Sequence, residues 1–97
     1  MVLKILFAED AVADLESIHD YISTDNPAAA KRFVSGLLNH VGLLATLPHI
    51  GAPISNHSGV RKMLHTPVRV YYRILEGRRA VQILHFWHVS RQEPKFR

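Results

Sequence analysis

The side chains best suited to chemistry lie in the second half of the sequence, on alternate positions of one predicted strand. Within residues 68–75, basic and aromatic side chains recur at every second position: Arg69, Tyr71 and Arg73. The positions between them are apolar, so we expect one face of this strand to lie in the core and the other to be exposed and basic.

Neighbouring strands, about 4.8 Å apart, would add further cations and histidines to this basic face. We therefore expect a concave patch on the sheet face opposite the predicted helices. Its expected members are Arg69, Tyr71, Arg73, His65, His88 and Arg91. Arg61 and Lys62, on the preceding strand, are further candidates to contact a partner.

A basic face with interleaved aromatic residues suits two kinds of partner. It can bind RNA or single-stranded nucleic acid through phosphate contacts and base stacking, or an acidic peptide through arginine–carboxylate pairs. Cleavage of RNA would need a base, an acid and a cation beside the phosphate. The candidates for those roles are His65, His85 or His88 with Arg69, Arg73 or Arg91. The alternative is that these arginines are simply solvated.

Cysteine is absent and seven histidines are present. Without cysteine, no disulfide framework, zinc ribbon, iron–sulfur site or thiol nucleophile can form, and a reducing, cytoplasmic location is expected. The histidines do not follow a metal-binding spacing, so we expect neither a metal site nor a cofactor. No apolar run approaches the ~20 residues that a membrane span requires.

Charge divides the sequence into two unlike halves. Residues 1–48 carry three basic and six acidic residues, a net charge of −3, whereas residues 49–97 carry nine basic and two acidic residues, a net charge of +7. This asymmetry indicates that the second half meets an anionic partner, either nucleic acid or an acidic protein segment.

The elements that must position these residues fit one domain spanning residues 1–97. Residues 2–7 are short, apolar and β-branched, which predicts a strand. Apolar residues at helical spacing predict an amphipathic helix of about four turns from residue 11. A second helix is predicted over residues 27–47, capped by Asp25 or Asn26 and ended by Pro48.

The remaining residues predict a loop and then three strands. The loop covers residues 48–59, and the strands cover residues 60–65, 68–75 and 80–89, with a tight turn at 76–79. The element order is therefore β-α-α-β-β-β. We expect an α+β fold in which an antiparallel helical hairpin packs on one face of a mainly antiparallel four-stranded sheet.

Several segments, taken together and in this order, resemble the RelE/ParE superfamily of type II toxin–antitoxin toxins. They are residues 14–22 (DLESIHDYI), 26–30 (NPAAA), 47–51 (LPHIG), 60–64 (VRKML), 69–74 (RVYYRI) and 88–91 (HVSR). The resemblance implies a small bacterial toxin of this fold that a cognate antitoxin holds inactive. It also implies one of two activities: ribosome-dependent mRNA cleavage in the RelE branch, or inhibition of DNA gyrase in the ParE branch.

The matching residues favour the ParE branch. Lys62, Arg69 and Arg91, with His88, resemble the RelE catalytic set, but Val60 stands where a second lysine is expected and no tyrosine follows Arg91. The helical hairpin, the LPHIG loop and the HVSR segment resemble ParE more closely. The resemblance therefore implies a toxin that is not an enzyme, that contacts gyrase and that is neutralised by a ParD-like antitoxin.

Two alternatives stay open. One is a RelE-like endonuclease that acts on mRNA at the ribosome. The other is a non-toxic module whose basic sheet face binds an acidic peptide or nucleic acid. For a toxin, we expect the antitoxin to bring acidic residues to Arg69, Arg73 and Arg91, and apolar residues to the seams of the helical hairpin.

Overall fold

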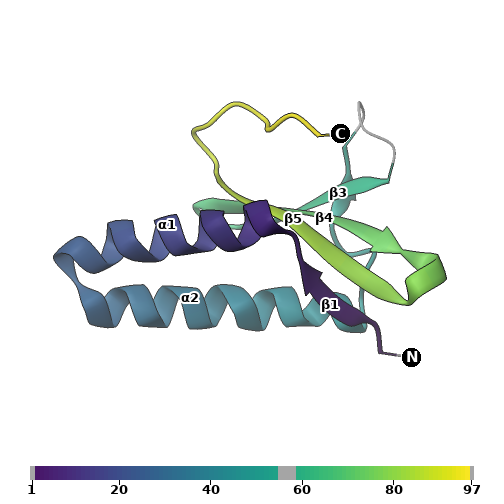
Figure 1. Cartoon of the computed structure of the whole chain (residues 1–97), viewed down its shortest axis with the longest axis horizontal. Coiled ribbons are helices and arrows are strands. Elements are labelled where there is room, and N and C mark those ends of the chain that lie inside the picture. The colour runs from purple at the N-terminus through teal and green to yellow at the C-terminus, as the bar shows by residue number, and fades with distance from the viewer. Residues whose placement is uncertain (1, 55–58, 97) are drawn as a thin grey trace.

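The computed structural model describes residues 2–54 and 59–96, which form two layers, a helical hairpin and a sheet (Figure 1). The elements in chain order are β1 (Lys4–Phe7), α1 (Glu9–Asp25), α2 (Pro27–Gly42), a 3-10 turn (Leu43–Ala45), β2 (Ala52–Pro53), β3 (Val60–His65), β4 (Val68–Leu75), a second 3-10 turn (Glu76–Arg78) and β5 (Ala80–His88). In the part of the chain that the structure describes, no helix combines the length and apolar character needed to cross a bilayer.

The sheet confirms the α+β class, but it has five strands rather than four. Its order is β1-β5-β4-β3-β2, with β1 parallel to β5 and every other pair antiparallel. The additional strand is β2, whose two residues pair with Lys62 and Arg61 of β3. The sequence predicts a loop at these two residues, because a two-residue strand is too short to show an alternating pattern.

The helix boundaries follow local chemistry. α1 begins at Glu9, two residues earlier than predicted, and places Glu9 and Asp10 in its first turn, where the helix dipole favours negative charge. Asn26 is the N-cap of α2, since its side-chain oxygen accepts a hydrogen bond from the Ala29 amide at 3.0 Å. The regular helix ends at Gly42, earlier than predicted, and a 3-10 turn carries the chain onward.

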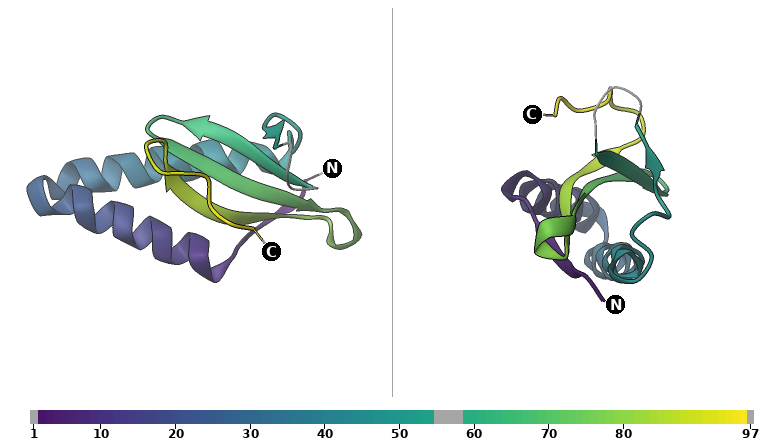
Figure 2. Two further views of the ribbon diagram at one scale, coloured as in Figure 1. Left: turned by 90° about the horizontal axis from the view of Figure 1, so that it is seen from above. Right: turned by 90° about the vertical axis from the view of Figure 1, so that its right-hand side faces the viewer.

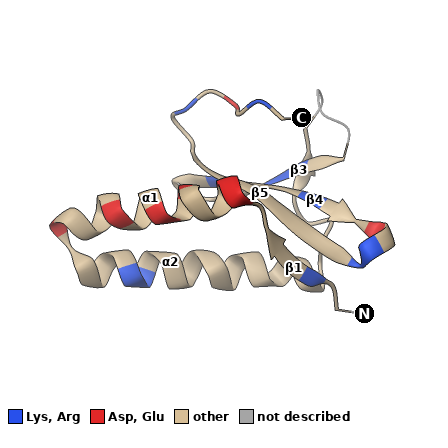
Figure 3. Cartoon of the chain, viewed as in Figure 1, with Lys and Arg blue, Asp and Glu red and all other residues tan. Residues whose placement is uncertain are grey.

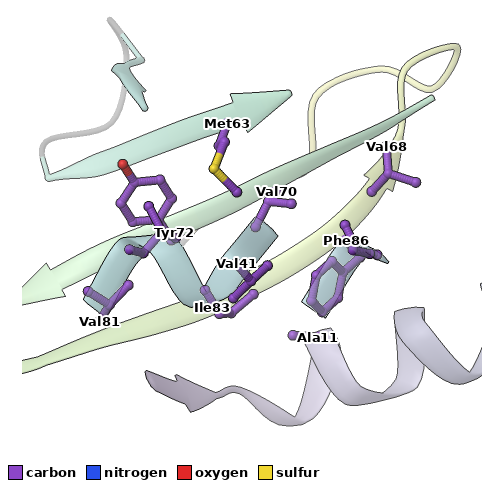
Figure 4. Close-up of a cluster of buried hydrophobic side chains, with 11 residues drawn as sticks. Ala11, Val41, Met63, Val68, Val70, Tyr72, Val81, Ile83 and Phe86 are labelled. Carbon is purple, nitrogen blue, oxygen red and sulfur yellow. The ribbon is translucent and has the colours of Figure 1, made fainter. Parts of the chain in front are cut away.

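The main core lies between the hairpin and one face of the sheet (Figure 4). The helical side supplies Ala11, Leu37, Val41 and Leu44, and the sheet side supplies Met63, Val68, Val70, Tyr72, Val81, Ile83 and Phe86. Phe86 joins this core because the register of β4 with β5 shifts after Tyr71, so that Leu84 is an extra residue on β5. Strand alternation alone puts Phe86 on the opposite face.

A buried tyrosine attaches the loop after the hairpin to the sheet. The Tyr72 hydroxyl donates to the Pro48 carbonyl at 2.7 Å and accepts from the Gly51 amide at 2.9 Å, while Arg61 donates to the Gly51 carbonyl at 2.7 Å. Burial raises the pKa of the Tyr72 hydroxyl above its ordinary value of 10.0, which keeps it protonated as a donor. At Gly51 a Cβ would lie 2.7 Å from the Lys62 carbonyl oxygen, so the close approach requires glycine.

Two histidines join α2 to the end of β3. The Nδ1 atoms of His40 and His65 are 2.8 Å apart, and the His65 ring meets Phe33 edge-on at 5.6 Å. One of these nitrogens must donate and the other accept, so the contact excludes protons on both. Burial, followed by the proximity of His40, lowers the pKa of His65 below its ordinary value of 6.5.

Removing the hydroxyl or crowding the loop should destabilise the fold. Tyr72→Phe leaves the Gly51 amide without its buried acceptor, and Gly51→Ala forces a methyl group against backbone, so each should lower the free energy of unfolding by about 1–3 kcal/mol. Tyr21→Phe is the matched control, because Tyr21 is 78% exposed. Urea unfolding measures all three, and equal stability of the Tyr72 and Tyr21 variants would contradict this role.

The histidine pair should make stability depend on pH. Because the pKa of His65 is lower in the folded chain than its ordinary 6.5, the unfolded chain binds more protons as pH falls through 6.5. The contribution of His65 to the free energy of unfolding is therefore complete above pH 6.5 and is lost progressively below that pH. We expect thermal unfolding scans between pH 7 and pH 5 to show a smaller fall in Tm for His65→Gln than for the unaltered chain. The exposed His88→Gln should behave as the unaltered chain.

Candidate functional site

β4 places its arginines as predicted. Val70 and Tyr72 face the helices in the main core, so Arg69, Tyr71 and Arg73 face the other way, onto what we call the outer face of the sheet. Lys62, paired with Tyr71, belongs to the same face and is exposed. The outer face therefore carries three of the predicted cations.

Arg61, His65 and His88 do not join them, so the prediction of one shared patch is wrong. Arg61 and His65 pair with Tyr72 and Val68, whose side chains enter the core, and they lie on the helix side of β3. His88 pairs with Val68 and also lies on the helix side, because the extra residue at Leu84 reverses the alternation of β5. The face that each of these three side chains occupies depends on strand register, and the pattern of a single strand does not specify its register.

The outer face is also covered rather than open. Tyr71 is only 1% exposed and forms a second cluster with Ile54 and Val60, against which Leu84, Trp87 and Phe96 pack. The centroids of the Phe96 and Tyr71 rings are 5.2 Å apart. Figure 2 shows the C-terminal tail crossing the sheet on the side away from the helices. Tyr71 is therefore a core residue, and its ring is not available to stack on a base.

Trp87 holds the start of the tail in place. Its indole nitrogen donates to the Gln92 carbonyl at 2.6 Å, and the Arg91 guanidinium lies 3.5 Å above its ring, a cation–π contact. Arg69 pairs with Trp87 in the sheet, at the end of the outer face where Arg91 stacks on the same tryptophan. Arg73 lies toward the other end, beside a cavity of about 500 Å³ that Gln82, His85 and Lys95 also line.

Among residues 2–54 and 59–96, no lysine or arginine lies within 4.0 Å of a carboxylate; the two ion pairs present both involve histidine. Figure 3 shows most of the acidic residues gathered on α1 and most basic residues on the sheet, the β4–β5 turn and the tail. The separation of acidic and basic residues along the sequence is therefore also a separation in space. Because no carboxylate of the described residues forms an ion pair with these cations, they can pair with an external anion.

Asp14 has a role that the sequence did not indicate. Its Oδ2 atom accepts a hydrogen bond from the Phe86 amide at 3.1 Å and lies 2.8 Å from Nδ1 of His85. β1 pairs with β5 only up to Ile83, so Asp14 satisfies an amide on the edge that β1 leaves open. His85, one of the predicted acid–base candidates, therefore helps to attach α1 to the sheet. Helical periodicity shows Asp14 only as a polar position.

The hydrogen bonds of His88 define its tautomer. The Ser90 amide donates to Nδ1 of His88 at 3.1 Å, and the Ser90 hydroxyl lies 2.6 Å from the same atom. An amide can only donate, so Nδ1 is the acceptor and the proton of the neutral ring is on Nε2. His88 is exposed and lines a second surface, an apolar groove at the end of the sheet.

We call this surface the end groove. It lies between the later turns of α1 and the ends of β4 and β5, with a volume of about 580 Å³. Its lining includes Ile18, Tyr21, Phe33, Val68, His88 and Arg91. The groove lies between α1 and the strand ends rather than along the seam between α1 and α2, and Arg91 lines it while its guanidinium stacks on Trp87.

The four residues that resemble the RelE catalytic set do not converge. Lys62 and Arg69 lie on the outer face, and His88 lies on the helix side. Lys62 and His88 are two strands and three positions apart in register, which corresponds to roughly 14 Å between their Cα atoms. A general acid and a base must both reach the same phosphate, and the side chains of these two residues lie on opposite faces of the sheet.

Comparison with known proteins identifies the family. The family model described as "ParE toxin of type II toxin-antitoxin system, parDE" matches residues 5–93. A chain of the chromosomal ParDE toxin–antitoxin system from P. aeruginosa superposes with a TM-score of 0.76 at 27% identity, over 91% of this chain and 97% of that one.

A second solved structure shares the fold alone. A chain of the toxin–antitoxin complex RelBE2 from Mycobacterium tuberculosis superposes with a TM-score of 0.64 at 24% identity, over 91% of this chain and 99% of that one. The search of curated proteins found no match.

Proposed function

The chain belongs to the ParE toxin family of type II toxin–antitoxin systems, and from this membership we propose that it inhibits DNA gyrase by protein contact and is neutralised by a cognate, ParD-like antitoxin. It would act in the cytoplasm, where its target operates. The observation that carries the proposal is the family match, which runs from β1 to the tail and includes every element of the fold.

The arrangement of side chains supports contact rather than catalysis. Tyr71 is buried, and His65 and His85 are engaged in contacts that join the helices to the sheet. The cations of the outer face form no ion pair with a carboxylate of the described chain, although Arg73 shares a cavity with His85, Glu9 and Asp10. Such a surface provides charge complementarity to a protein target, which steers association and selects the partner.

Cleavage of mRNA is the second candidate. It is favoured by the row formed by Lys62, Arg69 and Arg91, which resembles the RelE set and could hold a phosphate backbone. It requires His88, or another group, to move to the outer face on the ribosome. A non-toxic binding module is the third candidate, and normal growth of bacteria that express the chain alone would favour it.

Charge supports an acidic antitoxin. No carboxylate of the described chain lies within 4.0 Å of Arg69 or Arg73, so both can form arginine–carboxylate pairs with a partner. An antitoxin segment that crosses this face would supply those carboxylates. It would also contact or displace the tail, which lies over the same surface.

The two toxin activities can be separated with purified components. We expect the chain to inhibit supercoiling of relaxed plasmid by gyrase and to leave ribosome-bound mRNA intact. Prior mixing with the cognate antitoxin should restore supercoiling, which controls for contaminating nuclease. Unimpaired supercoiling together with cut ribosome-bound mRNA would reverse the assignment in favour of the RelE activity.

Reversing one outer-face charge should weaken the antitoxin complex. Arg73→Glu replaces an attractive contact by a repulsive one, so we expect the Kd to rise about three- to tenfold and its dependence on salt concentration to become weaker. Arg78→Glu, on the β4–β5 turn, is the control with the same change in net charge. Titration at two salt concentrations measures both effects. The same response from Arg73→Glu and Arg78→Glu would mean that only the net charge of the chain matters, and not the position of Arg73.

A further inference from the structure

Two histidines bring their ring nitrogens together at the boundary between the hairpin and the sheet. His40 lies in the last turn of α2, and His65 is the final residue of β3. Their Nδ1 atoms are 2.8 Å apart, and their ring centroids are 5.1 Å apart with the ring planes tilted by 52°. The two Nδ1 atoms therefore face each other closely enough for one small ion to contact both.

The pair has the properties of a metal-ligand set. Both residues are only partly buried, so water and ions can reach them. Burial, followed by the proximity of His40, lowers the pKa of His65 below 6.5, so its ring is uncharged at neutral pH and keeps a nitrogen lone pair for a ligand bond. Imidazole nitrogen suits transition metals, whereas Mg²⁺ and Ca²⁺ prefer oxygen ligands.

The distance between the two nitrogens selects among the transition metals. An imidazole nitrogen lies about 2.0–2.1 Å from a bound ion. Two such ligands are about 2.9 Å apart when they meet the ion at a right angle, and about 3.3 Å apart at the tetrahedral angle. The observed 2.8 Å fits the right angle of square-planar or octahedral coordination. Cu²⁺ and Ni²⁺ adopt square-planar or tetragonal geometry, whereas Zn²⁺ in proteins favours the tetrahedron.

We propose that His40 and His65 form a binding site for Cu²⁺ or Ni²⁺, in which each ring supplies its Nδ1 atom and water fills the remaining positions. Among residues 2–54 and 59–96, no group of three His, Cys, Asp or Glu side chains could hold a metal ion, so the protein supplies two ligands and the ion is exchangeable. The spacing of histidines along the sequence does not indicate this site, because 25 residues separate the two ligands. The site is independent of the proposed toxin function.

Binding requires a change of tautomer and a small rotation of the rings, without net loss of a proton. In the free chain one Nδ1 atom carries the proton that it donates to the other. When both Nδ1 atoms bind the ion, that proton transfers through solvent to Nε2 of the same ring. Rotation about the Cβ–Cγ bonds, a soft torsion in histidine, turns both lone pairs toward the ion. The ion then replaces the hydrogen bond as the link between α2 and β3.

Titration of the untagged chain with Ni²⁺ tests the site. At neutral pH, we expect calorimetry to show one ion bound per chain and tighter binding of Ni²⁺ than of Zn²⁺. Ni²⁺ at ten times its Kd should raise the Tm by about 5 °C, because the ion binds the folded chain. His40→Gln and His65→Gln should each raise the Kd about tenfold or more and abolish the shift in Tm. His19→Gln, at a side chain 46% exposed on α1, is the control and should change neither quantity.

Nuclear magnetic resonance locates the ion without any substitution. Paramagnetic Cu²⁺ should broaden the ring signals of His40 and His65 before those of the other histidines, and circular dichroism confirms that each Gln variant is folded.

Three results would contradict the proposal. Equal affinity of the unaltered chain and both Gln variants for Ni²⁺ would mean adventitious binding at the surface, and so would broadening that begins at other histidines. Tighter binding of Zn²⁺ than of Ni²⁺ would overturn the right-angle geometry. These measurements involve neither gyrase nor an antitoxin, so the toxin assignment stands or falls separately.

Discussion

The two central strands of this small sheet bury side chains on both of their faces, and the rest of the structure follows from the need to cover both. Val70 and Tyr72 of β4 are buried against the helical hairpin, and Tyr71 between them is buried on the other side. A sheet can bury both faces only if other parts of the chain cover each of them. The hairpin covers one face, and the C-terminal tail, through Phe96 and the Trp87 contacts, covers much of the other.

This double covering determines where charge can lie. With Tyr71 buried at the centre of the outer face, Arg69 and Arg73 flank it along β4, and no carboxylate of the described chain forms an ion pair with them. Arg91 occupies the point where the tail leaves β5, stacked on Trp87, and therefore borders both the outer face and the end groove. A partner that binds both surfaces would pass this residue.

Much of the fold could be read from local patterns, because caps and periodicity act over a few residues. Asn26 before Pro27 marked the start of α2, and the alternation of residues 68–75 put Arg69 and Arg73 on the correct face of β4. Less of the site could be predicted. The single extra residue at Leu84 moved His88 to the helix side, and β2, Asp14 and the tail act through contacts with residues far along the chain.

The sequence by itself determined the class of the fold, the order of its long elements and the division of charge between its halves, since each depends on composition or on spacing within one segment. Only the tertiary structure decided which cations share a surface, that Tyr71 is buried, and that an apolar groove stands open beside Arg91. These depend on strand register and on the path of the tail. A shift of one residue in register moves every side chain of a strand to the other face of the sheet. The sequence of one strand does not specify the register in which it pairs with its neighbour.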